Sequence, residues 1–97
     1  MIRHIAMFRF LPGTTDDQVR QLADGLRRLP GLIPEISAYR VGPDVALRDG
    51  NWDFAVVADF DGADEWRVYA THPSHLEAIA QWVTPIVSER ASIQYEW

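Results

Sequence analysis

The sequence contains no cysteine, which excludes disulfide bonds, thiolate nucleophiles and metal sites built from thiolates. Lysine is also missing, so the nine basic residues are all arginines, scattered along a chain with fourteen aspartates and glutamates and a formal net charge of −5. A nucleic-acid-binding protein needs clustered cations to neutralise phosphates, and the scattered arginines form no such cluster. Any chemistry must therefore come from oxygen- and nitrogen-bearing side chains.

Long apolar runs are missing as well. No segment approaches the ~18 apolar residues of a membrane span, and Arg3, His4 and Arg9 interrupt the apolar N-terminus. We therefore expect no membrane span and no signal peptide, and we predict a cytoplasmic protein. The 97 residues, of which 47% are hydrophobic and 24% charged, are typical of a single globular domain over residues 1–97.

Apolar periodicity predicts a succession of strands and helices. Residues 2–10 alternate between two faces, as a strand does, with His4 and Phe8 on the same face. Thr14 or Thr15 is expected to cap a helix that ends at Pro30. Further strands are predicted over 36–42, 52–60 and 92–97, with a connector over 31–34. A second helix is predicted over 61–71, capped by Asp61. A third is predicted from Pro73 onward, capped by His72 and interrupted by Pro85.

The resulting order, βαββαβ, is typical of the ferredoxin-like α+β fold, a four-stranded antiparallel sheet with its helices on one face. The other face of this sheet is also predicted to be apolar, because Ile5, Met7, Ala55 and Val57 point to it. Large exposed apolar patches are rare on monomers. We therefore predict a homodimer in which an identical sheet covers this face.

Several short motifs are spread over nearly the whole chain. They are Met1-Ile2-Arg3-His4-Ile5, Phe8-x-Phe10-x-Pro12-Gly13, Ile33-Pro34, Val41-Gly42, Tyr69, His72-Pro73-Ser74-His75 and Tyr95. In these residues the sequence resembles the stress-responsive A/B barrel domain (Dabb) family. The resemblance implies a dimeric α+β barrel, in which two ferredoxin-like subunits pack sheet to sheet.

The same resemblance bears on activity. The family includes the olivetolic acid cyclases of plants, which close a polyketide chain by aldol condensation without a cofactor. They use a histidine of the first strand, a tyrosine and the second histidine of His-Pro-x-His, which match His4, Tyr69 and His75. Two other pocket residues of the cyclase, a tyrosine and a histidine, correspond to Leu26 and Phe54. This departure argues against the same substrate.

Each candidate residue also has a structural interpretation. His4 lies on an apolar strand face, where it either hydrogen-bonds to a backbone carbonyl or to His75 for stability, or serves as an acid or base. His72 precedes a proline at a helix start, which favours a capping role. Tyr69 either holds a substrate oxygen or fills the core. The three histidines lack the spacing typical of a metal site, so we expect no metal and no cofactor.

These observations predict an apolar pocket between the sheet and the helices for a small aromatic or polyketide-like ligand. The expected substrate-binding residues are Phe8, Phe10, Phe54, Val56, Trp66, His72, Ile79 and Trp82. If the protein is an enzyme, we expect proton transfer next to a carbonyl, with His75 as the base, Tyr69 holding an oxygen and His4 positioning or relaying the proton. The alternative is a non-enzymatic stress-response or structural dimer, in which the histidines stabilise the fold.

Overall fold

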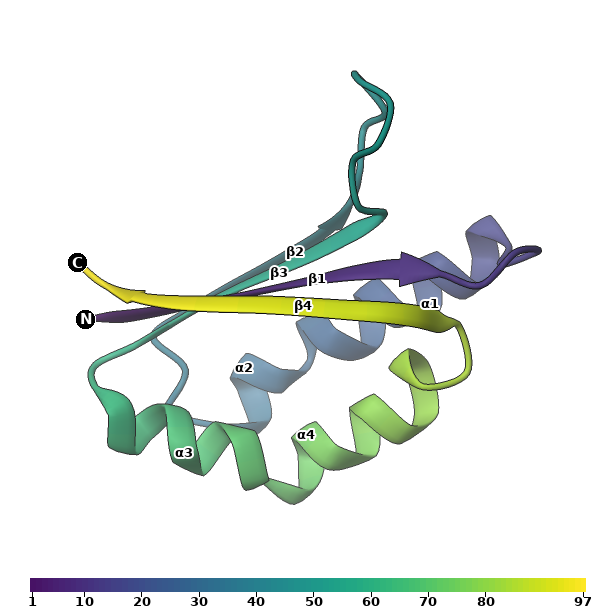
Figure 1. Ribbon diagram of the computed structural model, residues 1–97. Helices are drawn as coiled ribbons and strands as arrows, with labels where there is room; N and C mark the ends of the chain where they lie inside the picture. The colour runs from purple at the N-terminus through teal and green to yellow at the C-terminus, as the bar shows by residue number, and fades with distance from the viewer.

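The computed structural model describes residues 1–97 and has the predicted ferredoxin-like arrangement, with one antiparallel sheet in the strand order β2-β3-β1-β4. All the helices lie on one side of this sheet (Figure 1). The strands are β1 (Ile2–Phe10), β2 (Ala38–Pro43), β3 (Phe54–Phe60) and β4 (Val87–Glu96). The helices are α1 (Asp16–Arg27), α2 (Leu29–Leu32), α3 (Ala63–Thr71), α4 (Pro73–Ala78) and the π-helical turn η1 (Ile79–Val83). None of the helices has the length and apolar character that a membrane span requires.

Local capping signals explain where α1 begins and ends. The Thr15 hydroxyl accepts a hydrogen bond from the backbone N–H of Gln18, whose side chain accepts one from the backbone N–H of Thr15. This reciprocal pair satisfies two of the free donors at the helix start. The prediction of a connector at 31–34 was wrong, because the short helix α2 begins at Leu29. Pro30 lies in the first turn of α2, where its missing N–H costs no hydrogen bond.

Two further boundaries differ from the predictions. Strand β4 starts at Val87 rather than Ser92, because it pairs with β1 along nearly its whole length, from Phe10 opposite Val87 to Ile2 opposite Glu96. Asp61 does not cap α3, which begins after Gly62 without a side-chain cap. The Asp61 carboxylate instead accepts a hydrogen bond from Ser37 at 3.1 Å.

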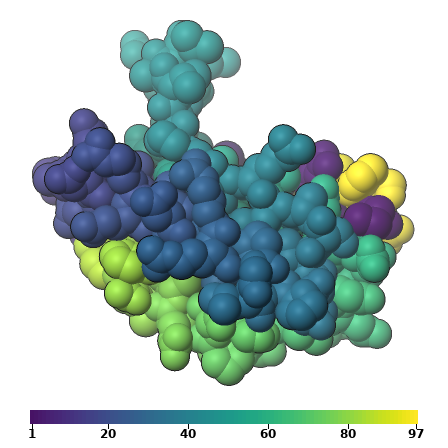
Figure 2. Space-filling model, turned by 180° about the vertical axis from the view of Figure 1, so that it is seen from behind, coloured from purple at the N-terminus to yellow at the C-terminus, as the bar shows by residue number.

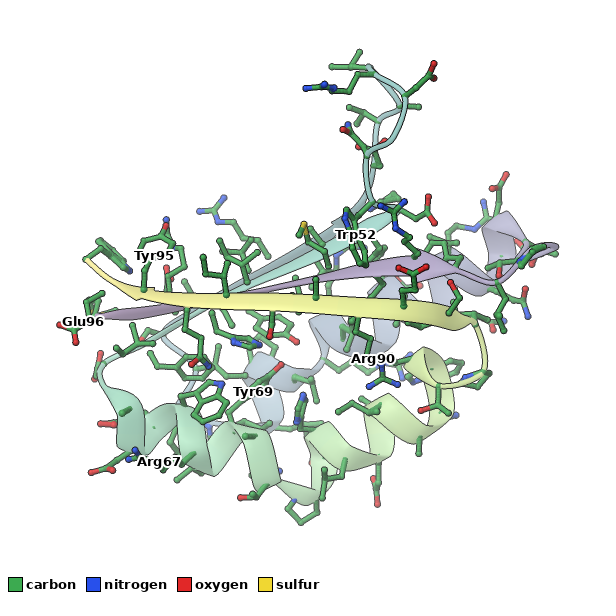
Figure 3. The ribbon with its side chains drawn as sticks, viewed as in Figure 1. Trp52, Arg67, Tyr69, Arg90, Tyr95 and Glu96 are labelled. Atoms are coloured by element: carbon green, nitrogen blue, oxygen red, sulfur yellow. The ribbon has the colours of Figure 1, made fainter.

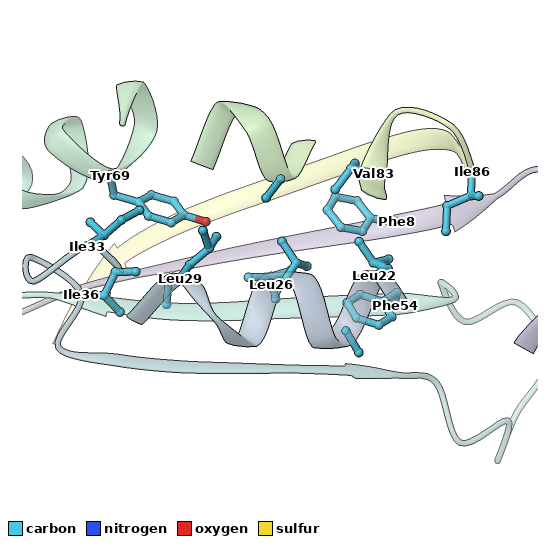
Figure 4. Packing of buried hydrophobic residues seen from close by; sticks show 14 of the residues in the cluster. Phe8, Leu22, Leu26, Leu29, Ile33, Ile36, Phe54, Tyr69, Val83 and Ile86 are labelled. Atoms are coloured by element: carbon cyan, nitrogen blue, oxygen red, sulfur yellow. The ribbon is translucent and has the colours of Figure 1, made fainter. Parts of the chain in front are cut away.

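The hydrophobic core fills the space between the sheet and the helices. Figure 4 shows Leu22 and Leu26 of α1 packed close to Phe8 of β1 and Phe54 of β3. Phe54 is 1% exposed and its ring lies against those of Phe8 and Phe10. The core therefore lies under the two central strands.

The opposite face of the sheet is uncovered in the single chain. The strand register places Ile5 of β1 beside Val57 of β3 and Ile93 of β4 on this face, and 61% of the surface of Ile93 is exposed. The loop that joins β2 to β3 stands out from the rest of the chain (Figures 1 and 2).

Candidate functional site

A cavity of about 280 Å³ lies between the sheet and the helices. It reaches the surface beneath the edge strand β4, where Arg90 and Ser92 are exposed. The thirteen residues that line it are His4, Ala6, Phe8, Leu26, Tyr39, Val56, Tyr69, His75, Ile79, Val83, Arg90, Ala91 and Ser92. A cavity of 150 Å³ holds benzene, so this one has room for a substituted aromatic ring.

His75 lies in the first turn of α4, just after the break between α3 and α4. Its ring lies against the Tyr69 ring at a tilt of 34°, with 4.1 Å between the centroids. Its Nδ1 lies 3.2 Å from the carbonyl oxygen of Ala70. A carbonyl can only accept, so Nδ1 carries the proton, and in the neutral ring Nε2 then has a free lone pair. This leaves Nε2 as a basic nitrogen for a ligand in the cavity.

His4 lies on β1, on the face that meets the helices. The side-chain amide nitrogen of Gln94, on the neighbouring strand β4, donates a hydrogen bond to its Nδ1 at 3.0 Å. Because Nδ1 accepts, the proton of the neutral ring is on Nε2. His4 and His75 therefore adopt opposite tautomers, and His4 presents a hydrogen-bond donor where His75 presents an acceptor.

Both of these histidines are held in the neutral form. Burial lowers the pKa of His4, and repulsion between the protonated forms of His4 and His75 lowers it further. Burial also lowers the pKa of His75, against the opposing effect of its hydrogen bond to Ala70. The ordinary value is about 6.5, so both rings are uncharged at neutral pH. A neutral imidazole can accept a proton at one ring nitrogen and donate a hydrogen bond from the other.

Two tyrosines also line this cavity. The hydroxyl groups of Tyr39 on β2 and Tyr69 on α3 are 3.0 Å apart. Burial raises the pKa of both phenols, so both remain protonated. One hydroxyl donates to the other, which leaves one phenolic proton for a ligand oxygen. Tyr39 was not among the predicted site residues, although its position opposite Ala58 puts it on the helix-facing side of the sheet.

The cavity brings together six of the predicted site residues. These are His4, Phe8, Val56, Tyr69, His75 and Ile79. It also includes seven that the sequence analysis did not select for the site, namely Ala6, Leu26, Tyr39, Val83, Arg90, Ala91 and Ser92. Leu26 is one of the two positions at which the sequence departs from the cyclases, and the other, Phe54, is fully buried in the core.

The remaining predicted residues lie outside the lining of the cavity, and each has a structural contact that explains its position. Phe10 is partly buried and packs on the ring of Phe54 at the edge of the core. Trp66 lies beside the His4 ring, with 6.1 Å between centroids and the rings tilted by 44°, and it borders a separate hollow.

The other two are His72 and Trp82. The Nδ1 of His72 accepts a hydrogen bond from the Ser74 backbone N–H and so caps α4. Trp82 lies directly over Gly25, where α1 and η1 meet. No three potential metal-binding side chains come close together.

Comparison with known proteins gives a consistent result. Residues 2–97 match the model of the stress responsive A/B barrel domain family. The uncharacterized protein SCO4036 of Streptomyces coelicolor is 32% identical over 84 residues, which are 84% of this chain and 87% of that protein.

Solved structures share the whole fold. A protein of unknown function from Thermobifida fusca, described as dimeric and ferredoxin-like, is 46% identical with a TM-score of 0.91, over 99% of this chain and 90% of its own. The hydroxynitrile lyase of Passiflora edulis has a TM-score of 0.83 at 19% identity, over 97% of this chain and 90% of its own. At that identity the likeness extends to the fold alone.

Proposed function

We propose a function on the premise that the chain belongs to the stress-responsive A/B barrel domain family. In this proposal the protein is a homodimer that binds a small aromatic or polyketide-like ligand. It transfers a proton at the carbon next to the ligand's carbonyl, without a cofactor. The observation that carries the proposal is the pair of neutral histidines in opposite tautomers, His4 and His75, in one cavity. A base for the C–H proton and a hydrogen-bond donor for the carbonyl oxygen are what enolisation of a carbonyl compound needs.

The chemistry follows from the positions of the protons. His75 Nε2 takes a proton from the carbon next to the carbonyl, and the electron pair of that C–H bond moves to form an enolate. The developing negative charge on oxygen is stabilised by the Nε2–H of His4 and by the free phenolic proton of the Tyr39–Tyr69 pair. The proton on His75 then returns to carbon or to a leaving oxygen, which restores the neutral ring.

Deuterium exchange tests this activity without knowledge of the natural substrate. Acetophenone, phenylacetone and 4-phenyl-2-butanone each carry one ring and exchangeable hydrogens beside a ketone. Incubation in heavy water followed by proton NMR measures the rate at which these hydrogens are lost. We expect wild type to accelerate exchange of at least one probe, and His75→Ala to reduce that rate at least ~10²-fold, the usual contribution of a general base.

A matched control separates catalysis from folding. His72→Asn keeps a side chain that caps helices well and alters a histidine that does not line the cavity. This variant should exchange deuterium at the wild-type rate. No wild-type acceleration with any of the three ketones, or a loss of only a few-fold in His75→Ala, would contradict the proposal.

The second candidate is a non-enzymatic stress-response dimer. One observation favours it: His4 and His75 each already have a hydrogen-bond partner within the fold, Gln94 and Ala70. In that case His75→Ala should mainly lower the stability, and no ketone should exchange faster than in buffer. The same pair of measurements therefore distinguishes the two functions.

The proposed dimer uses the uncovered face of the sheet. The apolar centre of this face includes Ile5, Val57 and Ile93. Near its edge, the Arg3 guanidinium donates two hydrogen bonds to the Asp59 carboxylate, at 2.8 and 2.9 Å. The dimeric description of the Thermobifida fusca protein supports the same assembly. Ile93→Asp should place a charge in the interface and yield monomers in analytical ultracentrifugation, whereas a wild-type monomer at micromolar concentration would contradict the proposal.

A further inference from the structure

Arg90 is the only residue lining the cavity whose side chain carries a permanent charge. It lies on β4 opposite Phe8 of β1, so it shares the helix-facing side of the sheet with that core residue. Figure 3 shows Arg90 and Tyr69 both between the sheet and the helices, while Tyr95 of β4 lies on the far side of the sheet. Arg90 therefore places a cation at the open edge of the site.

The guanidinium group of Arg90 has no carboxylate partner within the chain. Five ion pairs are present and none includes it, although Arg3, Arg9, Arg20, Arg27 and Arg67 each have an acidic partner. Its one side-chain hydrogen bond, to the Thr84 hydroxyl, is long at 3.5 Å. A guanidinium has five donors, so most of them remain free for a ligand.

Strand β4 contributes Arg90, Ala91 and Ser92 to the lining of the cavity, and two of these three side chains are polar. Ser92 lies opposite Ala6, and Gln94 lies opposite His4. Arg90 lies opposite Phe8, which is four residue steps from His4 along β1, so the two ends of the cavity are about 13 Å apart between backbones. The side chains at both ends reduce this distance. The facing wall is apolar and is formed by Leu26, Ile79 and Val83. One end of the cavity thus offers a cation, the other a proton donor and acceptor, and an apolar surface lies between them.

We propose that Arg90 binds a carboxylate of the ligand, so that the site takes a small aromatic or acyl acid whose carboxylate lies at Arg90 and whose carbonyl lies at His4 and His75. This inference rests on the proposed function, because it names the substrate class of the same site. Guanidinium and carboxylate match in shape and form two parallel hydrogen bonds. The cavity volume of about 280 Å³ suits one ring bearing both groups.

A pair of nearly isosteric probes tests the charge alone. 4-Acetylbenzoate carries a ketone and a carboxylate at opposite ends of one ring, and 4-acetylbenzamide replaces the carboxylate with a neutral amide. Isothermal titration calorimetry should show wild type binding the acid at least tenfold more tightly, in line with the ~1.5–3 kcal/mol of a hydrogen bond to a charged group. This preference should weaken as the salt concentration rises.

Arginine variants identify the residue that causes the preference. Arg90→Gln should bind the two probes with about equal affinity, while Arg90→Lys should keep part of the preference as a point charge. Arg67→Gln, which removes an exposed arginine of α3 outside the cavity, should behave as wild type. Equal affinity of wild type for acid and amide, or a preference that survives Arg90→Gln, would overturn the inference.

The neutral ketones keep this inference separate from the proposed function. If His75-dependent exchange of acetophenone is observed but Arg90 has no effect on acid binding, the inference is wrong and the proposed function stands. If neither probe binds and no ketone exchanges, both are wrong.

Discussion

The close contact between Gly25 and Trp82 allows a sharp test of how the helices that cover the cavity are packed. A methyl group built on Gly25 would lie 2.4 Å from Cδ1 and Nε1 of the Trp82 indole. Two carbons pack at about 3.5–4.0 Å, so the ring would have to move by more than 1 Å. Trp82 lies in η1, directly before Val83, which lines the cavity and is 1% exposed.

The expected magnitude combines two opposing effects. Forcing an extra carbon into a packed site costs about 1–3 kcal/mol. Alanine also favours a helix over glycine by about 1 kcal/mol. In the wild-type background, Gly25→Ala should therefore be neutral to destabilising. In a Trp82→Leu background the indole is gone, and the same change should stabilise by up to about 1 kcal/mol.

A double-mutant cycle measures this difference directly. Urea denaturation of wild type, both single variants and the double variant should give a coupling energy of about 1–3 kcal/mol between the two positions. The protomer concentration must be kept constant, because association alters the apparent stability. An equal effect of Gly25→Ala in the two backgrounds would refute the proposed packing of η1 on α1.

Three further results follow from the site and the core. Burial lowers the pKa of His4 and His75, so below about pH 6.5 the unfolded chain binds more protons than the folded one. The contribution of these two histidines to the free energy of unfolding should be constant above that pH and fall as the pH drops below it. Replacing both histidines with glutamine should remove this fall in urea titrations. Tyr39→Phe should cost about 0.5–1.5 kcal/mol of stability through the hydrogen bond lost to Tyr69, and unchanged denaturation would show that this bond contributes nothing. Phe54→Ala should cost about 3–5 kcal/mol because the side chain is fully buried, and a loss below 1 kcal/mol in the same assay would contradict its place in the core.

Much of the fold could be predicted from local signals. The alternation along β1 and the threonine cap of α1 are encoded within a few residues, and both were confirmed. The first half of β4 was missed because Ser88, Glu89 and Arg90 have no strand character of their own. They are extended because this part of β4 pairs with β1, more than seventy residues away in the sequence, with Ser88 at an irregularity in the register.

The composition of the site was harder to predict for the same reason. His4 and His75 come together because β1 and α4 pack across the core, which a family motif can indicate. Tyr39 and Arg90 lie on the two edge strands, and their orientation depends on strand register, which one sequence does not reveal. Large aromatic residues such as Phe54 were instead assigned to the pocket, although they fill the core beside it.

The tautomers of the histidines test the central claim most directly. Long-range ¹H–¹⁵N NMR spectra of the labelled protein at pH 7 distinguish protonated from unprotonated ring nitrogens. His75 should be neutral with its proton on Nδ1, where the Ala70 carbonyl accepts it. His4 and His72 should carry theirs on Nε2, because their Nδ1 atoms accept hydrogen bonds from Gln94 and Ser74. A charged His75 at this pH, or the same tautomer in His4 and His75, would contradict the roles of His75 as the base and His4 as the hydrogen-bond donor.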